Sequence, residues 1–218
     1  MKILITGATG YIGKRLIHTL TNQGHQVVCA VRDILRFDSL AYNKDTLEVV
    51  EVDFLKPETL AFIPNDIEVA YYLIHSMSNS TADFDELEKT CAINFKTYIS
   101  KTQTKQVIYL SGISNDHNLS KHLASRKNVE KELVSKDYAL TTFRAGIIVG
   151  SGSASFEIIR DLVEKLPLMV TPKWLNTKSQ PIGVRDVMGF LSKAAGNASV
   201  FNQTFDIVGP EILSYKTM

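Results

Sequence analysis

Apolar runs alternate with amphipathic segments along most of the chain, and this pattern predicts a parallel sheet with helices on both faces. Six runs have the length and the apolar character of buried strands, at residues 3–5, 27–31, 47–52, 69–74, 107–110 and 140–143. Helical spacing predicts a short helix from Pro57 and longer helices at residues 11–23, 83–102 and 120–136. Six strands, each separated from the next by a helix, are typical of an α/β fold with a Rossmann-type doubly wound parallel sheet.

The rhythm of strands and helices changes beyond Gly146. A Gly/Ser-rich turn comes first, followed by a helical segment that ends at Leu166 and another from Arg185 to Ala195. No repeat or low-complexity linker divides the chain. We therefore expect a nucleotide-binding domain at residues 1–150 and a small C-terminal substrate lobe, residues 151–218, packed on its edge.

A glycine-rich turn, TGATGYIG, joins the first predicted strand to the first helix. Its glycines follow GxxGxxG spacing, which permits a tight turn, close approach of a pyrophosphate and close packing of the helix on the strand. The amides and the dipole of the helix start favour a bound anion. We interpret the turn as a dinucleotide-binding loop, with a purely structural turn as the alternative. The expected contacts are Gly7, Thr9, Gly10, Tyr11, Ile12 and Gly13.

Arg32 closes the second predicted strand, where NAD-specific proteins usually carry an acidic residue that holds the ribose hydroxyls. An arginine suits a 2′-phosphate instead, through charge-assisted and bidentate contacts. Asp33 follows immediately, and a shift of one position would place its carboxylate at the ribose. We predict NADP as the cofactor and keep NAD as the alternative.

Further candidate contacts follow the third and fourth strands. Asp53 and Phe54 come after the third strand and are expected beside the adenine. His75 ends the fourth strand, and in open α/β sheets ligands bind outside the carboxyl ends of the strands. His75 is therefore a candidate cofactor or substrate contact, and a loop histidine bonded only to backbone is the alternative.

Composition argues against several other classes of function. The chain has 218 residues, and its 24 Lys and Arg nearly balance its 23 Asp and Glu. The sequence has neither a large positive charge nor a basic stripe with interleaved aromatic residues, so it does not indicate nucleic-acid binding. The histidines are scattered, and Cys29 and Cys91 lack metal-ligand spacing, so we expect core thiols and no metal site. No apolar run has membrane-spanning length, and the chain starts with a strand. We expect a cytoplasmic protein with a small-molecule substrate and neither nucleic-acid nor membrane partners.

Four features together resemble the extended or atypical short-chain dehydrogenase/reductases: TGATGYIG, Asp53, Asn94 and YLSG, which contains Ser111. In that superfamily they are the phosphate loop, an adenine-side aspartate, a helix-four asparagine and the catalytic serine. Longer stretches, among them AYYLIHSM and HLASRKNVEKEL, are similar to a bacterial group of NmrA-like, NAD(P)-binding nucleoside-diphosphate-sugar-epimerase-type proteins. The likeness runs over nearly the whole chain. Members of that group commonly continue into a further C-terminal domain, so we expect a shortened chain or a short member.

One departure from the superfamily bears on catalysis. Where the resemblance places the proton-donating tyrosine and the lysine of YxxxK, this chain has His122 and Arg126, and Glu130 supports that register. Arg126 can bond a ribose but cannot take part in a proton relay, because a guanidinium does not deprotonate in proteins. His122 is a candidate general acid, with an exposed helix residue as the alternative. Tyr109 lies within a strand and is a poor substitute.

Two hypotheses follow. The first is an NADP-dependent oxidoreductase for a small carbonyl, quinone or sugar-nucleotide substrate, in which Ser111 orients the substrate oxygen and His122 or water supplies the proton. The second is a non-catalytic NADP-binding sensor or regulatory domain, as in NmrA-type proteins. Loss of YxxxK favours the second, and Ser111 favours the first. A monomer and a homodimer both remain open.

Overall fold

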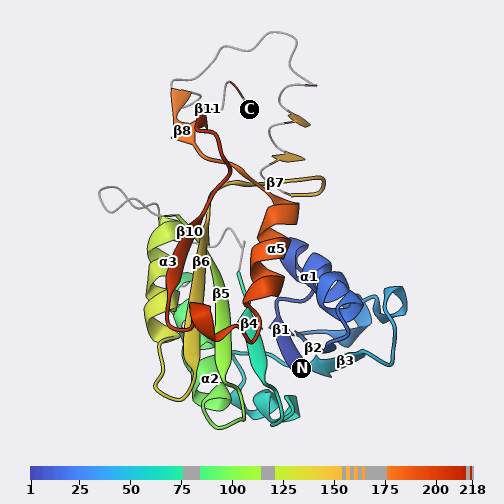
Figure 1. Ribbon diagram of the computed structural model, residues 1–218. Coiled ribbons are helices and arrows are strands. Elements are labelled where there is room, and N and C mark those ends of the chain that lie inside the picture. The colour runs from blue at the N-terminus through green and yellow to red at the C-terminus, as the bar shows by residue number, and fades with distance from the viewer. Residues whose placement is uncertain are drawn as a thin grey trace.

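The computed structural model describes residues 1–75, 84–113, 121–153 and 176–214, together with 156–157, 160–161, 164 and 217. Its centre is a seven-stranded parallel sheet in the order β10-β6-β5-β4-β1-β2-β3 (Figure 1). The strands are β1 (Lys2–Thr6), β2 (Gln26–Val31), β3 (Leu47–Glu51), β4 (Val69–Tyr72), β5 (Gln106–Gly112), β6 (Ala139–Ala145) and β10 (Thr204–Ile207). This arrangement confirms the predicted doubly wound Rossmann-type sheet.

Helices cover both faces of the sheet (Figure 1). The α-helices with described bounds are α1 (Tyr11–Asn22), α2 (Phe84–Ile99), α3 (Lys121–Glu132) and α5 (Val184–Ala194). Short 3-10 helices are η1 (Ile34–Arg36), η2 (Ser39–Ala41), η3 (Pro57–Phe62) and η5 (Ala198–Val200). Two small sheets lie above the carboxyl ends of the central strands, and they pair β7 (Ile148–Val149) with β9 (Ile182–Gly183) and β8 (Lys178–Ser179) with β11 (Leu213–Ser214).

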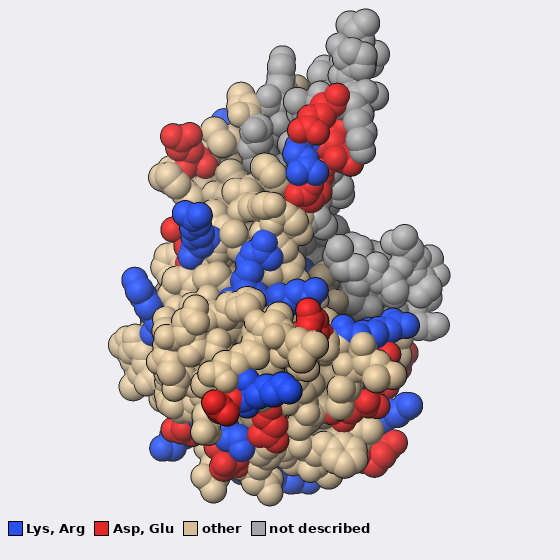
Figure 2. All heavy atoms as spheres, turned by 90° about the vertical axis from the view of Figure 1, so that its right-hand side faces the viewer, with Lys and Arg blue, Asp and Glu red and all other residues tan. Residues whose placement is uncertain are grey.

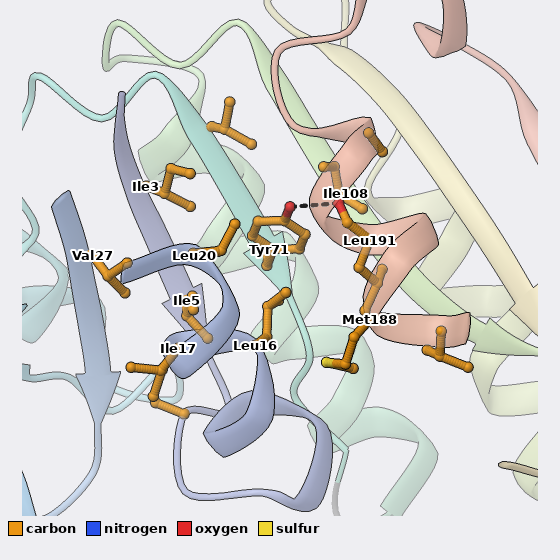
Figure 3. Close-up of a cluster of buried hydrophobic side chains, with 14 of the residues drawn as sticks. Ile3, Ile5, Leu16, Ile17, Leu20, Val27, Tyr71, Ile108, Met188 and Leu191 are labelled. Atoms are coloured by element: carbon orange, nitrogen blue, oxygen red, sulfur yellow. Dashed lines mark hydrogen bonds between the residues drawn. The ribbon is translucent and has the colours of Figure 1, made fainter. Parts of the chain in front are cut away.

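Each face of the sheet has its own apolar core, because successive strand residues point to opposite faces. Ile3 and Ile5 of β1 lie in the cluster beneath α1 and α5, which Figure 3 shows. Leu4 lies in the cluster beneath α2 and α3. Burial of an aliphatic side chain of this size contributes about 1.5–3 kcal/mol. Because both faces are covered, the central strands are unbroken apolar runs in the sequence.

Two elements beyond residue 150 belong to these layers, in contrast to the expectation that residues 151–218 all form a lobe. β10 is a seventh strand, which pairs with β6 so that Phe205 lies opposite Phe143. α5 packs against α1, and the buried Tyr71 hydroxyl of β4 donates to the Leu191 carbonyl of α5 at 2.7 Å (Figure 3). The central sheet therefore includes a strand from beyond the expected domain boundary at residue 150. A substrate lobe made of the rest of that segment stays a prediction.

The connection from β2 to β3, which is described throughout, has no α-helix, in contrast to the helix expected between each pair of strands. It contains η1 and η2, whose first amides are bound by side chains. Asp33 accepts from the Leu35 amide at 2.9 Å, and Asp38 accepts from the Leu40 amide at 3.2 Å. Bonds of this local kind compete with a continuous helix. The short helix expected from Pro57 is present as η3.

Charged side chains of both signs are mixed over the face that carries α1 and the β3 edge (Figure 2). This mixture agrees with the near balance of acidic and basic residues in the sequence. An anion on this face must therefore be held by local groups instead of a broad positive field. Within the described ranges, no helix is long and apolar enough to cross a membrane.

Gln106 offers a test of the placement of α5. Its fully buried amide nitrogen donates to the Thr141 hydroxyl at 2.9 Å and the Ala194 carbonyl at 3.0 Å, and its oxygen accepts from the Gly196 amide at 2.8 Å. We expect Gln106→Leu to lower the free energy of unfolding by about 2–4 kcal/mol, because buried polar groups lose their partner. Urea denaturation measures this loss.

Gln203→Leu is the matched control, because Gln203 is exposed and makes one side-chain bond, to the Ser199 carbonyl at 2.8 Å. We expect this variant to change stability by no more than about 0.5 kcal/mol. Equal losses in the two variants would contradict the burial of Gln106 at the end of α5.

Candidate functional site

The turn between β1 and α1 is shaped by close contacts of its glycines. Gly7 has a positive φ of 66°, and a Cβ atom there would lie 2.5 Å from the Leu73 carbonyl oxygen. A Cβ atom at Gly13 would overlap the Gly7 carbonyl and lie 2.9 Å from the Ala8 Cα atom. Both positions therefore require glycine, which brings the start of α1 close to the end of β1.

The first turn of α1 is left open to an anion. Gly10 stands at the N-cap, no side chain caps it and the first turn has no acidic residue. The amides at a helix start lack partners within the helix, and together with the helix dipole they favour negative charge. These residues fit the pyrophosphate of a dinucleotide.

A cavity of about 400 Å³ extends from this turn over the carboxyl ends of the strands. It is bounded by residues after β1 and β4, by the end of β5, by residues after β6, and by side chains of α2 and α3. The predicted site residues that line it are Gly7, Gly10, Tyr11, Ile12, Gly13, His75, Ser111 and Arg126. Thr6 helps to position two of these walls, because its hydroxyl donates to the Tyr71 carbonyl and accepts from the Leu73 amide, each at 3.0 Å.

The Tyr11 hydroxyl provides a second indication of a ligand-binding site. It is buried in the cavity wall and has no hydrogen-bond partner among the described residues. The ring is held in place by Arg15, whose guanidinium carbon lies 3.9 Å from the ring centroid and which donates to the Ser151 carbonyl at 2.7 Å. A buried hydroxyl without a partner is costly, and a bound polar molecule would supply one.

Glu88 of α2 was not identified from the sequence. Its side chain is only 6% exposed and borders the cavity. One carboxylate oxygen lies 3.2 Å from Nδ1 of His75, and the other accepts from the Ser125 hydroxyl of α3 at 2.6 Å. The signal was a carboxylate in the apolar stripe of the helix, since Glu88 shares its buried face with Ala92, Phe95 and Ile99. Leu87, the residue before it, is 47% exposed.

Tyr109 also reaches the cavity, because it shares a face of β5 with Ser111. Its hydroxyl donates to the Arg126 carbonyl at 3.2 Å. Burial raises the pKa of Tyr109 to about 12, and hydrogen bonding with Ser111 and the charge of Arg126 offset only part of this effect. The phenol is therefore a weak acid whose proton already has an acceptor. His122 lies in the first turn of α3, but its side chain is outside the described residues.

The residues predicted at the adenine end lie outside this cavity. Arg32 is exposed beyond β2. Asp53 accepts from the Leu55 amide at 3.0 Å. Phe54 is 5% exposed and packs with Phe95 at 5.9 Å between ring centroids, so its ring faces the core and not a ligand.

Asn94 acts on the same loop from α2. Its amide nitrogen donates to the Phe54 carbonyl at 2.8 Å, so it positions the chain after β3. Arg32 and Asp53 both act electrostatically on Cys91 of α2, whose pKa burial raises to about 11. Arg32 and Asp53 therefore both lie on the side of the sheet near Cys91.

A family model described as NAD(P)H-binding matches residues 7–151. The chain belongs to this family. The match includes the glycine turn, the ends of β4 and β5, and Arg126. The prediction of an atypical short-chain dehydrogenase/reductase of the NmrA-like, epimerase type is thereby confirmed, and the chain is an NAD(P)-binding protein.

Curated relatives are distant and longer. The photosystem II assembly factor Ycf39 of Synechocystis sp. is 23% identical over 96% of this chain, which spans 63% of that protein. The 40 kDa subunit of NADH-ubiquinone oxidoreductase of Neurospora crassa is 24% identical over 95% of this chain, which spans 55% of that subunit. The chain thus spans less than two thirds of the length of either relative.

Solved structures confirm the fold. UDP-glucuronic acid 4-epimerase from Bacillus cereus, in complex with UDP-glucuronic acid and NAD, superposes with a TM-score of 0.77 at 17% identity, covering 100% of this chain and 80% of the epimerase. UDP-glucose 4-epimerase from Thermotoga maritima, with UDP-glucose, gives a TM-score of 0.78 at 14% identity, with the same coverage of 100% and 80%. At these identities the likeness extends to the fold alone.

Gly13 provides the test of the turn. We expect Gly13→Ala to lower stability by about 1–3 kcal/mol, because the added methyl group meets backbone atoms that have no room to move. NADPH binding, measured by calorimetry, should be lost.

Gly189→Ala is the matched control, because a Cβ atom at this position within α5 meets nothing within 4 Å. It should raise stability by about 0.5–1 kcal/mol and leave the nucleotide affinity unchanged. Wild-type NADPH affinity in Gly13→Ala would contradict the close-packed turn.

Proposed function

We propose that the protein is an NADP-dependent oxidoreductase that acts on a small carbonyl, quinone or sugar-nucleotide substrate. The observation that supports this proposal most strongly is the continuity of one cavity from the glycine turn to Ser111 and His75. A phosphate-binding turn and polar groups suited to a substrate oxygen thereby share a single site.

The residues of the cavity suggest a division of roles. The amides at the start of α1 would hold the pyrophosphate, and the Tyr11 hydroxyl would donate to an oxygen of the cofactor. Arg126 would bond the nicotinamide ribose. When bound, the nicotinamide supplies hydride transfer. Ser111 would orient the substrate oxygen, with His122 or water as the proton source expected from the sequence.

The preference for NADP over NAD rests on the engagement of Asp33. One oxygen of its carboxylate accepts from the Leu35 amide at 2.9 Å, and the other lies 3.2 Å from Nε of Arg36. This carboxylate therefore has partners other than a ribose. Arg32 is exposed beside it, and an exposed guanidinium suits a 2′-phosphate.

Calorimetry with NADPH and NADH on the Arg32→Ala variant tests this preference. We expect the affinity for NADPH to fall about 10- to 100-fold, because the variant loses a charge-assisted hydrogen bond. The affinity for NADH should stay the same. Arg36→Ala is the control, since Arg36 pairs with Asp33; it should leave NADPH binding within about threefold. Equal losses for NADPH and NADH in Arg32→Ala would refute the phosphate contact.

A non-catalytic NADP-binding sensor is the second candidate. It is favoured by the absence of a tyrosine at position 122 and by the engagement of the Tyr109 hydroxyl with a backbone carbonyl. The name of the relative Ycf39, a photosystem II assembly factor, also describes a role other than turnover. Tight NADPH binding without cofactor oxidation by quinones, aldehydes or keto forms of nucleotide sugars would favour this candidate.

A further inference from the structure

Three polar side chains from three separate elements meet at the wall of the cavity. His75 follows β4, Glu88 lies on α2 and Ser125 lies on α3. Glu88 and Ser125 are 5% and 1% exposed, and both carboxylate oxygens of Glu88 are bound, one to each partner. A buried carboxylate is costly unless it is hydrogen-bonded in this way, so the arrangement needs all three residues.

The contact with Glu88 orients the imidazole of His75. When Glu88 is ionised, its carboxylate only accepts hydrogen bonds, and Nδ1 of His75, which lies 3.2 Å from it, then carries the proton of that bond. Ser125 donates to the second oxygen at 2.6 Å and fixes the carboxylate itself. Nε2 is then the ring nitrogen that exchanges a proton, and His75 lines the cavity together with Ser111.

Among the residues that the structure describes, the other groups that face this part of the cavity are poorer proton donors. Glu88 of α2 accepts two hydrogen bonds, and Tyr109 of β5 donates its proton to the Arg126 carbonyl. The guanidinium of Arg126 on α3 does not deprotonate in proteins. Imidazole, in contrast, is the side chain that ordinarily exchanges protons near neutral pH.

We propose that His75 exchanges the proton with the substrate oxygen at this site, with Glu88 and Ser125 as its positioning residues. This inference rests on the proposed function and names a proton donor for it. During reduction, the Nε2–H bond of the imidazolium breaks, its electron pair stays on Nε2, and an O–H bond forms on the substrate oxygen. The reductant is the reduced nicotinamide cofactor. Solvent restores the Nε2 proton after product leaves.

The first experiment needs neither cofactor nor turnover. NMR of the ring nitrogens in the free full-length chain reports the tautomer of His75, assigned through His75→Gln. We expect Nδ1 to be protonated in the wild-type protein. In Glu88→Gln, the side-chain amide oxygen accepts from Ser125, so the NH2 group faces Nδ1 of His75. Because an NH2 group only donates, Nδ1 must then accept, and we expect the ring proton to lie on Nε2. A wild-type His75 with unprotonated Nδ1 would overturn the proposal.

The second experiment compares NADPH oxidation with NADPH affinity, using menadione, phenanthrenequinone, nitrobenzaldehyde and a UDP-4-keto sugar as probes. We expect His75→Gln to lower kcat at least about 100-fold and Glu88→Gln at least about tenfold, with NADPH affinity and melting temperature near those of the wild type. Ser125→Ala should lower kcat less, because it frees the carboxylate without removing it. His18→Gln, on the exposed side of α1, is the histidine control and should keep full activity.

The outcomes separate the inference from the proposed function. If the wild-type chain does not bind NADPH, both fail. If it binds NADPH but oxidises it with no probe, the oxidoreductase and the inference on His75 both fail, and the nucleotide site of a sensor stands. If His75→Gln keeps its turnover while His122→Gln loses it, the inference on His75 fails and the oxidoreductase stands.

Discussion

Gly13 packs against the backbone of Gly7 and Ala8 so closely that no side chain fits between the start of α1 and the end of β1. This contact directs the unpartnered amides of α1 toward the carboxyl ends of the strands. The same turn brings Gly7 against the Leu73 carbonyl after β4, so His75 two residues later lies in the same cavity. The positions of the nucleotide-binding turn and of the candidate proton donor thus both depend on the close contacts of the glycine turn between β1 and α1.

The sheet order extends this constraint to the rest of the site. On one side of β1 lies β4, with β5 beyond it, which brings His75 and Ser111 to a common edge. β2 and β3 lie on the other side, which places Arg32 and Asp53 away from the cavity and near Cys91. The two ends of a dinucleotide would therefore meet chemically different groups, as expected at a switch point of a doubly wound sheet.

Much of this arrangement was predictable. The central strands could be predicted because both faces of the sheet are covered, so that their residues are apolar throughout. The positions of the glycine turn, His75 and Ser111 could be predicted because strand ends and glycine spacing are local features of the sequence. β10 was missed: it is a four-residue edge strand with two exposed residues, interrupted by Asp206, and so lacks an apolar run. Only its pairing with β6 places it in the sheet.

Side-chain partners across elements were not predictable. The helical spacing of Glu88 with Ala92, Phe95 and Ile99 signals its burial. Its partners His75 and Ser125 come from other elements, and no local feature of the sequence identifies them. Phe54 was expected beside the adenine, but packing against Phe95 turns its ring into the core. Asn94 reaches the same loop through the Phe54 carbonyl, as a support and not as part of the cavity wall.

A crystal structure of the chain grown with NADPH would show whether this cavity is the nucleotide site. We expect the pyrophosphate on the amides at the start of α1, the Tyr11 hydroxyl bonded to the cofactor, and the nicotinamide in the cavity between His75 and Ser111. A nucleotide bound elsewhere, or a cavity that stays without nucleotide at saturating NADPH, would contradict this expectation.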